Sequence, residues 1–427
     1  MRVLWITNAL LNKFSLQFLK KQSINFYVDA LVKYFENNQS IYLSVATPYR
    51  TNTIIKETID GIDYFALPNN LPGLLKDTKK IRAIYRAFLK ENRPDIVNIF
   101  GTEFLHSRII YELSQELGIP CVFFIQGLLS EISIYSCADL SQKVRRKYIT
   151  LRDIYRRELL THESKSFSIE AKNEISVLKN PINYIYENDW CKSVCCFFNK
   201  KSKGYKINLP IDFEIFSEQR KKVVVERRDP ILICNASGYP LKGLHIILLS
   251  ISILKEKYPN IKLIVPGRSM ICPTSIIKRQ RYPGYYVLIS DMIKNLGLEN
   301  NVEFSGYLSP KELCDKTISA DIFVLTSALE NHSSSLKEAM ILGMPCIASY
   351  VGGVDSYCNE GVNVLLYRFG DYKTLAYKID HLFNDKKLMI DLGCRARKEM
   401  LDNPNNNLRN IFHGFIDCYQ DIIRGSK

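Results

Sequence analysis

The amino-acid sequence predicts an α/β protein with two domains, each built on a parallel β-sheet. The chain has 427 residues, which favours two or three domains over one. Hydrophobic residues make up 46% of the chain and charged residues 24%, as in ordinary globular proteins, so disorder is excluded as the dominant state. Short apolar runs alternate with longer segments of helical period, which is typical of parallel sheets covered by helices.

The same alternation runs through both halves of the chain. In the first half the predicted strands are Val3–Ile6, Ile41–Ala46, Ile96–Phe100, Cys121–Ile125 and Tyr184–Tyr186, with helices that include Ile24–Phe35, Thr78–Leu89 and Ser107–Leu117. In the second half the strands are Ile231–Cys234, Lys262–Val265, Val302–Phe304, Ile322–Leu325, Cys346–Ala348 and Val364–Leu366, with helices Leu244–Lys255, Asp291–Leu296 and Leu336–Leu342.

A change in composition marks the boundary between the predicted domains. Residues Ser217–Asp229 are rich in Lys and Arg and are followed by Pro230, just before a new strand. We therefore place the N-terminal domain at 1–215, the second at 216–405, and a final helix within 406–427. Two doubly wound, Rossmann-like domains that face each other would create a cleft between the carboxyl ends of their strands, where ligands bind. Two independent domains are the alternative, which the short linker disfavours.

Charge and cysteine content narrow the function classes. Lys and Arg number 58 against 44 Asp and Glu, a net charge of +14, which attracts nucleic acid, phosphorylated molecules or an anionic membrane. The 12 cysteines are scattered without a C-x-x-C pair, which argues against a zinc site and favours a reducing cytosol. The N-terminus lacks a leader pattern and no apolar run is long enough to span a bilayer, so we expect a cytoplasmic protein.

The richest candidate site lies in the stretch Ala328–Gly353, where a strand, a polar loop and a helix follow one another. Ser333, Ser334 and Ser335 precede Leu336, and the helix is expected to begin at Ser335 or Leu336. Hydroxyls and backbone N–H groups at a helix N-terminus suit a phosphate. Ordinary N-capping by one serine is an equally good interpretation.

Two glutamates flank this turn. Glu330 lies on the loop near the strand end, and Glu338 lies about one turn into the helix, where it would accept hydrogen bonds from sugar hydroxyls. The alternative for Glu338 is a solvated helix face. His332, between them, is a candidate for lining the same pocket, whereas His106 and His162 have no metal-spaced partner and are interpreted as structural.

Glu330, seven residues, and then Glu338-Ala-Met-x-x-Gly-x-Pro-x-Ile-Ala-Ser-x-x-Gly-Gly together resemble the nucleotide-sugar signature of the family 4 glycosyltransferases, retaining enzymes of the GT-B fold. The resemblance continues at Asn301–Tyr307, which is similar to the family's base-binding loop and includes the site candidate Tyr307. It implies that Glu330 faces the donor sugar, that Glu338 binds the ribose, and that the turn from Ser333 to Leu336 holds the pyrophosphate through backbone amides.

A second element of the resemblance is the loop Asn235–Gly243. Lys242 aligns with the family's pyrophosphate lysine, and a cation there offsets charge on the departing diphosphate without a metal or other cofactor. Ser237 departs from the pattern, since an arginine is common at this position. Arg268, which follows Gly267 at the end of the next strand, would supply the positive charge that Ser237 lacks. The alternative is that Arg268 is an ordinary surface arginine.

The first half resembles the family more loosely and is expected to bind the acceptor. Glu103, Gln126 and Gly127 follow predicted strands at the edge that would face the cleft. Gln126 stands where many family members have a histidine, and Asn8–Gln22 lacks the family's glycine-rich turn. A front-face retaining transfer needs no strong base, because the departing phosphate oxygen can take the acceptor proton.

The segment 143–157 interleaves Lys and Arg with aromatic and apolar residues at helical spacing, and Lys79–Lys90 presents a similar basic face. Both segments fall within the predicted first domain. Such a pattern suits an anionic membrane surface or a lipid-linked acceptor, and a solvated helix face is the alternative. No nucleic-acid-binding module accompanies the charge, so a nucleic-acid partner is not expected.

The resemblance implies a retaining glycosyltransferase that moves a sugar from a nucleoside-diphosphate sugar to a hydroxyl of a lipid-linked saccharide in surface-polysaccharide biosynthesis. The final helix, Leu408–Ile423, would cross back onto the first domain. The expected location is cytoplasmic or peripheral at the inner face of the cell membrane. A nucleotide-sugar epimerase of GT-B architecture and a catalytically inactive scaffold that binds membranes or anions are the alternatives.

Overall fold

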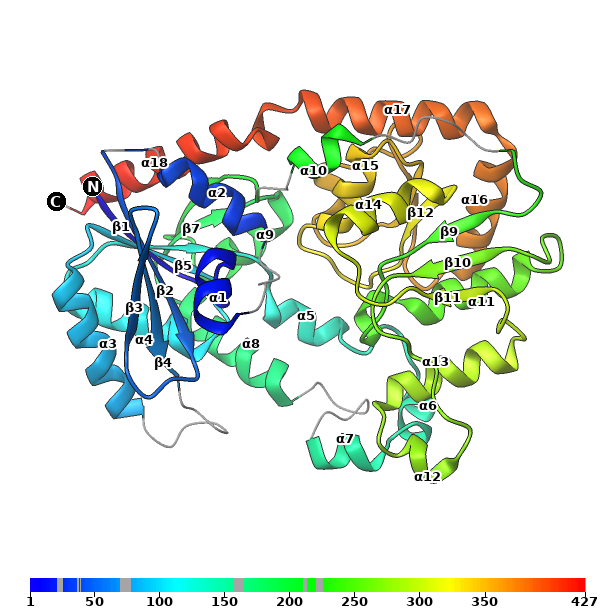
Figure 1. The fold of residues 1–427 in the computed structure, drawn as a ribbon, viewed down its shortest axis with the longest axis horizontal. Coiled ribbons are helices and arrows are strands. Elements are labelled where there is room, and N and C mark those ends of the chain that lie inside the picture. Colours follow the sequence, from blue (N-terminus) through cyan, green and yellow to red (C-terminus); the bar gives the residue numbers. More distant parts are fainter. Residues whose placement is uncertain are drawn as a thin grey trace. The chain divides into compact units, whose positions relative to one another are not determined.

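The chain forms two compact units in the computed structural model, and each is described by itself (Figure 1). Unit 1 comprises Met1–Ser130, Ile169–Asp212 and Pro404–Lys427, and unit 2 comprises Glu131–Ser168 and Phe213–Asn403. The structure describes residues 1–20, 26–36, 38, 40–69, 78–156, 165–209, 213–219 and 226–426.

Unit 1 contains a sheet with the strand order β3-β4-β2-β1-β5-β6-β7-β8, in which β3 is antiparallel to β4 and the other neighbours are parallel. Successive residues of β1 point to opposite faces, and both faces are buried because helices cover both sides. The strands are β1 (Arg2–Ile6), β2 (Tyr42–Tyr49), β3 (Ile55–Ile59), β4 (Ile62–Pro68), β5 (Ile96–Phe100), β6 (Cys121–Phe124), β7 (Asn183–Tyr186) and β8 (Lys203–Lys206).

The helices of unit 1 divide between the two faces of this sheet. One apolar cluster joins a sheet face to α1 (Asn12–Leu19), α2 (Phe26–Glu36) and α18 (Leu408–Gly425). The cluster on the other face includes residues of α3 (Thr78–Asn92), α4 (Leu105–Glu116), α8 (Lys165–Leu178) and α9 (Asp189–Phe198).

The C-terminal helix α18 is fixed to the sheet of unit 1 by a buried hydrogen-bonded group. The phenol oxygen of Tyr419 accepts hydrogen bonds from Trp5 Nε1 at 3.0 Å and from Asn98 Nδ2 at 2.8 Å. Phe415 stacks on Phe124 with ring centroids 5.8 Å apart. The chain therefore returns to unit 1 after it has completed unit 2.

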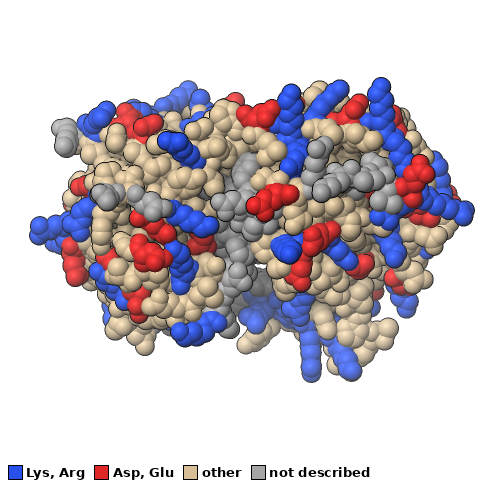
Figure 2. Space-filling model, turned by 45° about the horizontal axis from the view of Figure 1, so that its top comes forward, with Lys and Arg blue, Asp and Glu red and all other residues tan. Residues whose placement is uncertain are grey.

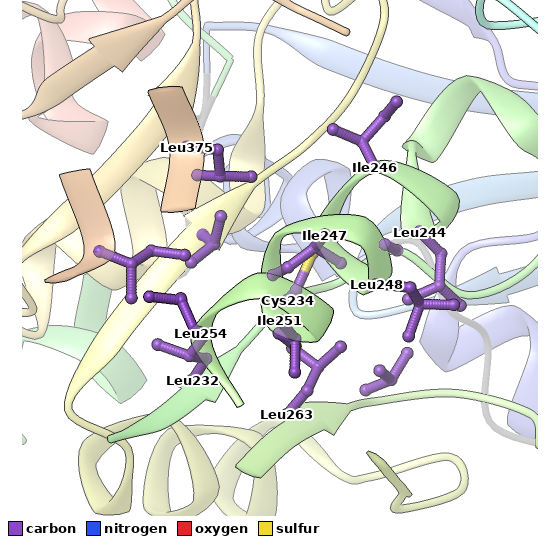
Figure 3. Packing of buried hydrophobic residues seen from close by; sticks show 14 of the residues in the cluster. Leu232, Cys234, Leu244, Ile246, Ile247, Leu248, Ile251, Leu254, Leu263 and Leu375 are labelled. Atoms are coloured by element: carbon purple, nitrogen blue, oxygen red, sulfur yellow. The ribbon is translucent and has the colours of Figure 1, made fainter. Parts of the chain in front are cut away.

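Unit 2 contains a parallel sheet with the order β11-β10-β9-β12-β13-β14. The helix α11 (Leu244–Leu254) packs on it with an almost entirely apolar sequence, which is typical of a helix buried on most of its surface. Figure 3 shows its Leu and Ile side chains against Leu232, Cys234, Leu263 and Leu375. The strands are β9 (Ile231–Ile233), β10 (Lys262–Val265), β11 (Val302–Phe304), β12 (Ile322–Leu325), β13 (Cys346–Ser349) and β14 (Leu365–Tyr367).

The remaining helices belong mostly to unit 2, and among the described residues no helix is long and apolar enough to cross a membrane. They are α5 (Leu129–Tyr135, whose first residues lie in unit 1), α6 (Gln142–Lys147), α7 (Leu151–Arg156), α10 (Phe213–Glu218), η1 (Pro240–Lys242), α12 (Ile276–Arg279), α13 (Gly284–Asn295), α14 (Pro310–Ser319), α15 (Ser334–Ile341), η2 (Val354–Ser356), α16 (Tyr372–Asn384), α17 (Lys386–Asp402) and η3 (Pro404–Asn406, in unit 1).

The described residues of the segment 131–168 pack with unit 2, although the sequence analysis placed the segment, with its basic residues, in the first domain. The carboxylate of Asp153 accepts the backbone N–H of Gly284 at 2.9 Å, and the carbonyl of Ala138 accepts from His245 Nε2 at 2.9 Å. These contacts join residues far apart in sequence, so the alternation of strands and helices along the chain did not reveal them.

The sequence analysis found eleven of the strands and missed β3, β4 and β8. The β3–β4 hairpin turns at Asp60-Gly61, where both residues have positive φ (51° and 79°), and this dipeptide is a strong hairpin signal that went unused. The helix α1, within the segment that lacks the family's glycine-rich turn, is not among the predicted helices, and it begins without a side-chain cap. Both omissions reflect weak or overlooked local signals.

We expect Tyr419→Phe to lower the free energy of unfolding of unit 1 by about 1–3 kcal/mol, because it leaves two buried N–H donors, on Trp5 and Asn98, without their acceptor. The urea midpoint followed by tryptophan fluorescence measures this, since both tryptophans of the chain, Trp5 and Trp190, lie in unit 1. Tyr377→Phe, at an exposed tyrosine, is the matched control. Equal midpoints for both variants would contradict the role given to the buried phenol.

Candidate functional site

Gly243 joins the loops that follow the neighbouring strands β9 and β12. It has φ 71°, and a Cβ atom there would lie 1.8 Å from the carbonyl oxygen of Thr326. The hydroxyl of Thr326 donates to the Lys242 carbonyl at 2.7 Å, and the N–H of Ala328 donates to the Leu241 carbonyl at 2.7 Å. The backbone approach that only glycine permits therefore brings the two loops together.

Lys242 and Glu330, predicted from separate motifs, meet at this junction. Lys242 Nζ lies 2.7 Å from Glu330 Oε1, and the hydroxyl of Ser327 donates to the same oxygen at 2.5 Å. The two side chains remain 28% and 11% exposed, so the pair is partly open to solvent. Burial acts to lower the pKa of Lys242, but the Glu330 carboxylate outweighs it and the pKa is raised, so the ammonium stays charged.

The backbone of Glu330 is held from its other side by the two glycines that end the signature. Gly352 has φ 53°, and a Cβ atom there would lie 2.0 Å from the Glu330 carbonyl oxygen. The N–H of Gly353 donates to the same oxygen at 3.0 Å. Both glycines therefore fix the position from which the Glu330 carboxylate projects.

The serine turn caps the helix α15. Ser333 is the N-cap residue, its hydroxyl accepts from the Leu336 N–H at 3.4 Å, and the helix begins at Ser334, slightly before the predicted start. The capping interpretation therefore applies to Ser333, whose hydroxyl also lies 3.3 Å from that of Ser335. Ser334 is exposed, Leu336 is buried, and Glu338 is half-buried within the helix.

Lys337 is a buried cation that the sequence analysis did not single out. Its ammonium lies 3.3 Å from His332 Nδ1 and 5.3 Å from the centre of the Tyr357 ring, which also packs against the His332 ring. A lysine ammonium only donates, so His332 Nδ1 accepts and the proton of the neutral ring sits on Nε2. The burial of Lys337 depends on these tertiary contacts, so its local sequence gave no signal of it.

Ser237, Gly267 and Tyr307 lie on neighbouring loops after β9, β10 and β11. Gly267 has φ 108°, a Cβ atom on it would lie 2.1 Å from the Ser237 hydroxyl, and its N–H donates to the Gly306 carbonyl at 2.7 Å. Arg268 and Tyr307 are both exposed. The predicted candidates of this loop group are thus adjacent along one edge of the unit 2 sheet.

The acceptor-side candidates follow adjacent strands of unit 1. Gln126, after β6, accepts a hydrogen bond from Asn8 Nδ2 at 3.0 Å, and Gly127 is half-buried beside it. Glu103, after β5, is 7% exposed, and burial, followed by the charges of Glu174 and Glu170, raises its pKa to about 8. Glu103 is therefore enclosed in the interior of unit 1 and protonated at neutral pH.

Of the remaining residues named in the sequence analysis, His106 is enclosed in unit 1, and His162 and Arg157 lie outside the described residues. Burial lowers the pKa of His106 to about 3, and its ring stacks on Phe104, which fits the structural interpretation. No group of His, Cys, Asp and Glu suited to a metal ion occurs among the residues that the structure describes.

Residues 215–399 match the family model described as Glycosyl transferases group 1. This chain carries a glycosyl transferases group 1 domain. The match covers the loops with Lys242, Glu330 and Glu338. In unit 2 the prediction of a glycosyltransferase domain is thus confirmed, while the assignment to family 4 and the roles of individual residues stay predictions.

Several curated relatives that match part of the chain are named as synthases or glycosyltransferases. N-acetyl-alpha-D-glucosaminyl L-malate synthase of Bacillus anthracis is 28% identical over 142 residues, covering 33% of this chain and 36% of its own length. Mannosylfructose-phosphate synthase of Agrobacterium fabrum is 30% identical over 159 residues (37% and 30%), and the capsular polysaccharide biosynthesis glycosyltransferase CapM of Staphylococcus aureus is 27% identical over 199 residues (44% and 44%). This chain therefore spans less than half the length of these relatives.

Solved structures match the whole chain at the level of fold. Sucrose-phosphate synthase from Thermosynechococcus elongatus superposes with a TM-score of 0.73 at 15% identity, covering 100% of both chains. Anabaena Alr3699/HepE in complex with UDP-glucose gives a TM-score of 0.63 at 15% identity, covering 100% of this chain and 99% of the other. Two α/β units with parallel sheets and these likenesses confirm the predicted GT-B fold class.

We expect Gly243→Ala to destabilise unit 2 and to impair the junction that carries Lys242 and Glu330. The added Cβ meets a backbone carbonyl oxygen at 1.8 Å, so the two loops must separate. Gly361→Ala is a matched control, because Gly361 has φ 70° but no atom within 4 Å of the added Cβ. Left-handed strain alone costs about 1–2 kcal/mol, and thermal unfolding should show a clearly larger loss for Gly243→Ala. Similar melting temperatures for both variants would contradict the close approach.

We expect Glu103→Gln to flatten the pH dependence of unit 1 stability. The pKa of Glu103 is raised from 4.5 to about 8, so the native protein keeps a proton that the unfolded chain releases. The protonated Glu103 therefore adds to the free energy of unfolding. This contribution is complete below pH 4.5 and is lost as the pH rises toward 8, by about 1.4 kcal/mol per pH unit. Urea midpoints across this range should shift progressively in favour of the variant.

The control for this pH series is Glu91→Gln, at an exposed glutamate on α3 of the same unit. Its midpoints should run parallel to those of the wild type. If the Glu103→Gln series is also parallel, the raised pKa of Glu103 is wrong.

Proposed function

We propose that the protein is a retaining glycosyltransferase that transfers a sugar from a nucleoside-diphosphate sugar to a hydroxyl of a saccharide acceptor. The observation that carries this proposal is the Lys242–Glu330 pair, 2.7 Å apart, at the joined loops of the group 1 domain. A charged lysine and a carboxylate fixed at the carboxyl ends of parallel strands suit a ligand with both phosphates and hydroxyls.

The proposed chemistry assigns the negative charge of the leaving group to Lys242 and α15. The bond between the anomeric carbon and the diphosphate oxygen breaks, and the acceptor oxygen bonds to that carbon on the same face. The departing phosphate oxygen takes the acceptor proton, so no separate base is required. Lys242 and the amide-lined N-terminus of α15 stabilise the charge that develops on the diphosphate.

The glutamates and the neighbouring loops orient the donor in this proposal. Glu330 accepts hydrogen bonds from the sugar, and the hydroxyl of Ser327 keeps the carboxylate in place. Glu338 accepts from the ribose hydroxyls. The exposed Tyr307 and Arg268 lie on the loops proposed to contact the base and the phosphates. The fold likeness to a structure solved with UDP-glucose supports a nucleotide-sugar donor.

We further propose that the acceptor is a lipid-linked saccharide used in surface-polysaccharide assembly, with the protein working at the inner face of the cell membrane. A relative named for capsular polysaccharide biosynthesis supports this pathway class. The net charge of +14 and the basic segment 143–157 suit an anionic membrane surface. No metal or cofactor is part of the proposed reaction.

We expect Lys242→Ala to lower kcat by about 100-fold or more, as for other single contacts to a developing negative charge. Lys242→Arg should recover part of the rate because it keeps a cation. The assay is transfer from a panel of radiolabelled nucleoside-diphosphate sugars to membrane extracts. Lys311→Ala, at an exposed lysine on α14, is the control and should behave as wild type.

Three outcomes would overturn parts of this proposal. Unchanged turnover of Lys242→Ala would remove Lys242 from the reaction. Conversion of a sugar nucleotide without any acceptor would indicate an epimerase. Absence of binding by every donor in calorimetric titrations would indicate a catalytically inactive scaffold.

A further inference from the structure

Helices α7 and α12 form one projecting surface of unit 2 although they are far apart in sequence (Figure 1). The backbone N–H groups of Leu151 and Arg152 donate to the side chain and the carbonyl of Gln280, each at 3.0 Å. The hydroxyl of Thr150 donates to the Tyr282 carbonyl at 2.8 Å. We call this surface, formed by 150–156 and 276–282, the α7–α12 face.

Large apolar side chains are exposed on the α7–α12 face. Five of them are between 57% and 85% exposed, whereas large apolar side chains are often buried in globular proteins. A group of exposed apolar side chains on one surface marks contact with lipid or protein. They are Leu151, Ile154, Tyr155, Ile276 and Ile277.

The charge that surrounds these side chains is positive. Arg156, Lys278 and Arg281 are exposed on the face, and the exposed Lys143, Arg146 and Lys147 lie on the neighbouring helix α6. Asp153 is the one acidic residue in the sequence of 141–156 and 271–282. Its carboxylate is buried and accepts from the N–H groups of Thr150 and Gly284, so it points inward.

The other basic helix predicted from the sequence, α3, has cations that are paired with glutamates. On α3, Arg82 pairs with Glu112 and Glu116, and Arg86 also pairs with Glu116. The α3 cations are therefore partly neutralised within unit 1, which leaves the α7–α12 face as the stronger candidate for binding anions. Figure 2 shows Lys and Arg side chains gathered at several places on the surface, including the lower edge of the view.

We propose that the α7–α12 face docks unit 2 on a membrane surface of anionic phospholipid. The apolar side chains enter the boundary between headgroups and acyl chains while the surrounding cations bind the headgroups, and both contributions are needed because either alone gives weak binding. This inference deepens the proposed function and rests on it for the lipid-linked acceptor. It adds residues 276–282 to residues 143–156 of the basic segment and places the contact on the unit that carries the group 1 domain.

Flotation of the full chain with lipid vesicles tests this inference. We expect binding to vesicles of phosphatidylcholine mixed with phosphatidylglycerol, little binding to phosphatidylcholine alone, and release by added salt. Joint Ile276→Ser and Ile277→Ser substitution should weaken the partition coefficient by about tenfold or more. Lys278→Ala and Arg281→Ala should each weaken it by about fivefold.

Matched controls lie on α16 of the same unit. Tyr377→Ser removes an exposed aromatic ring and Lys373→Ala removes an exposed cation, and neither should change the partition coefficient. Ile277→Trp provides a direct probe, because the two native tryptophans lie in unit 1. Its fluorescence should shift to shorter wavelength on anionic vesicles and be quenched by brominated lipids.

Several results would overturn the inference. Equal binding to both kinds of vesicle, no binding, or unchanged binding of the α7–α12 variants would each exclude this face as a membrane contact. Dissociation of a dimer by the same substitutions in sedimentation experiments would assign the face to a second copy of the chain. Calorimetric titration with nucleoside-diphosphate sugars separates this test from the proposed function, since the α7–α12 variants should bind a donor like the wild type. Flotation without donor binding would refute only the proposed function.

Discussion

The close approach of Gly243 to the Thr326 carbonyl is the constraint on which the proposed site depends. The loops after β9 and β12 come from neighbouring strands, but neighbouring strands alone leave their loops free to diverge. A glycine in the left-handed region lets the two backbones touch, and the Thr326 hydroxyl then binds the Lys242 carbonyl. Lys242 and Glu330 are thereby set within hydrogen-bond distance before any ligand is considered, which is the preorganisation that electrostatic catalysis requires.

The partners of Glu330 determine how the pair can work. Ser327 donates to the same carboxylate oxygen as Lys242, and the Glu330 backbone is fixed by Gly352 and Gly353. If Lys242 turned to a diphosphate, as the proposed function requires, the carboxylate would keep the Ser327 donor and its position. A lysine is well suited to this change of partner, since its ammonium is a point charge on a flexible stem, whereas an arginine fork would demand planar, two-point contacts.

Local sequence patterns predicted most of the strands and the motifs that carry the central site candidates, because both depend on short segments. Eleven strands read as short apolar runs, and Glu330, Lys242 and Glu338 belong to contiguous motifs. The hairpin β3–β4 and the capless helix α1 were missed where local signals were weak or unused. Lys337 was missed because its burial against His332 and Tyr357 is a tertiary fact, and the same holds for the segment 131–168, whose place in unit 2 depends on Asp153 and Ala138.

A continuous set of buried contacts connects the α7–α12 face to the Lys242 loop within unit 2. Asp153 of α7 binds the first N–H of α13, and the next residue of that helix, Tyr285, lies with its phenol oxygen 3.0 Å from His245 Nδ1. His245 stands two residues after Gly243 and donates from Nε2 to the Ala138 carbonyl. Burial lowers the pKa of His245 to about 4, so the ring stays neutral and Nδ1 accepts from the phenol at any physiological pH. These contacts connect the α7–α12 face to α11, the helix that begins at the proposed donor site. A membrane contact at α7 and α12 would therefore set the orientation of the Lys242 loop relative to the lipid surface.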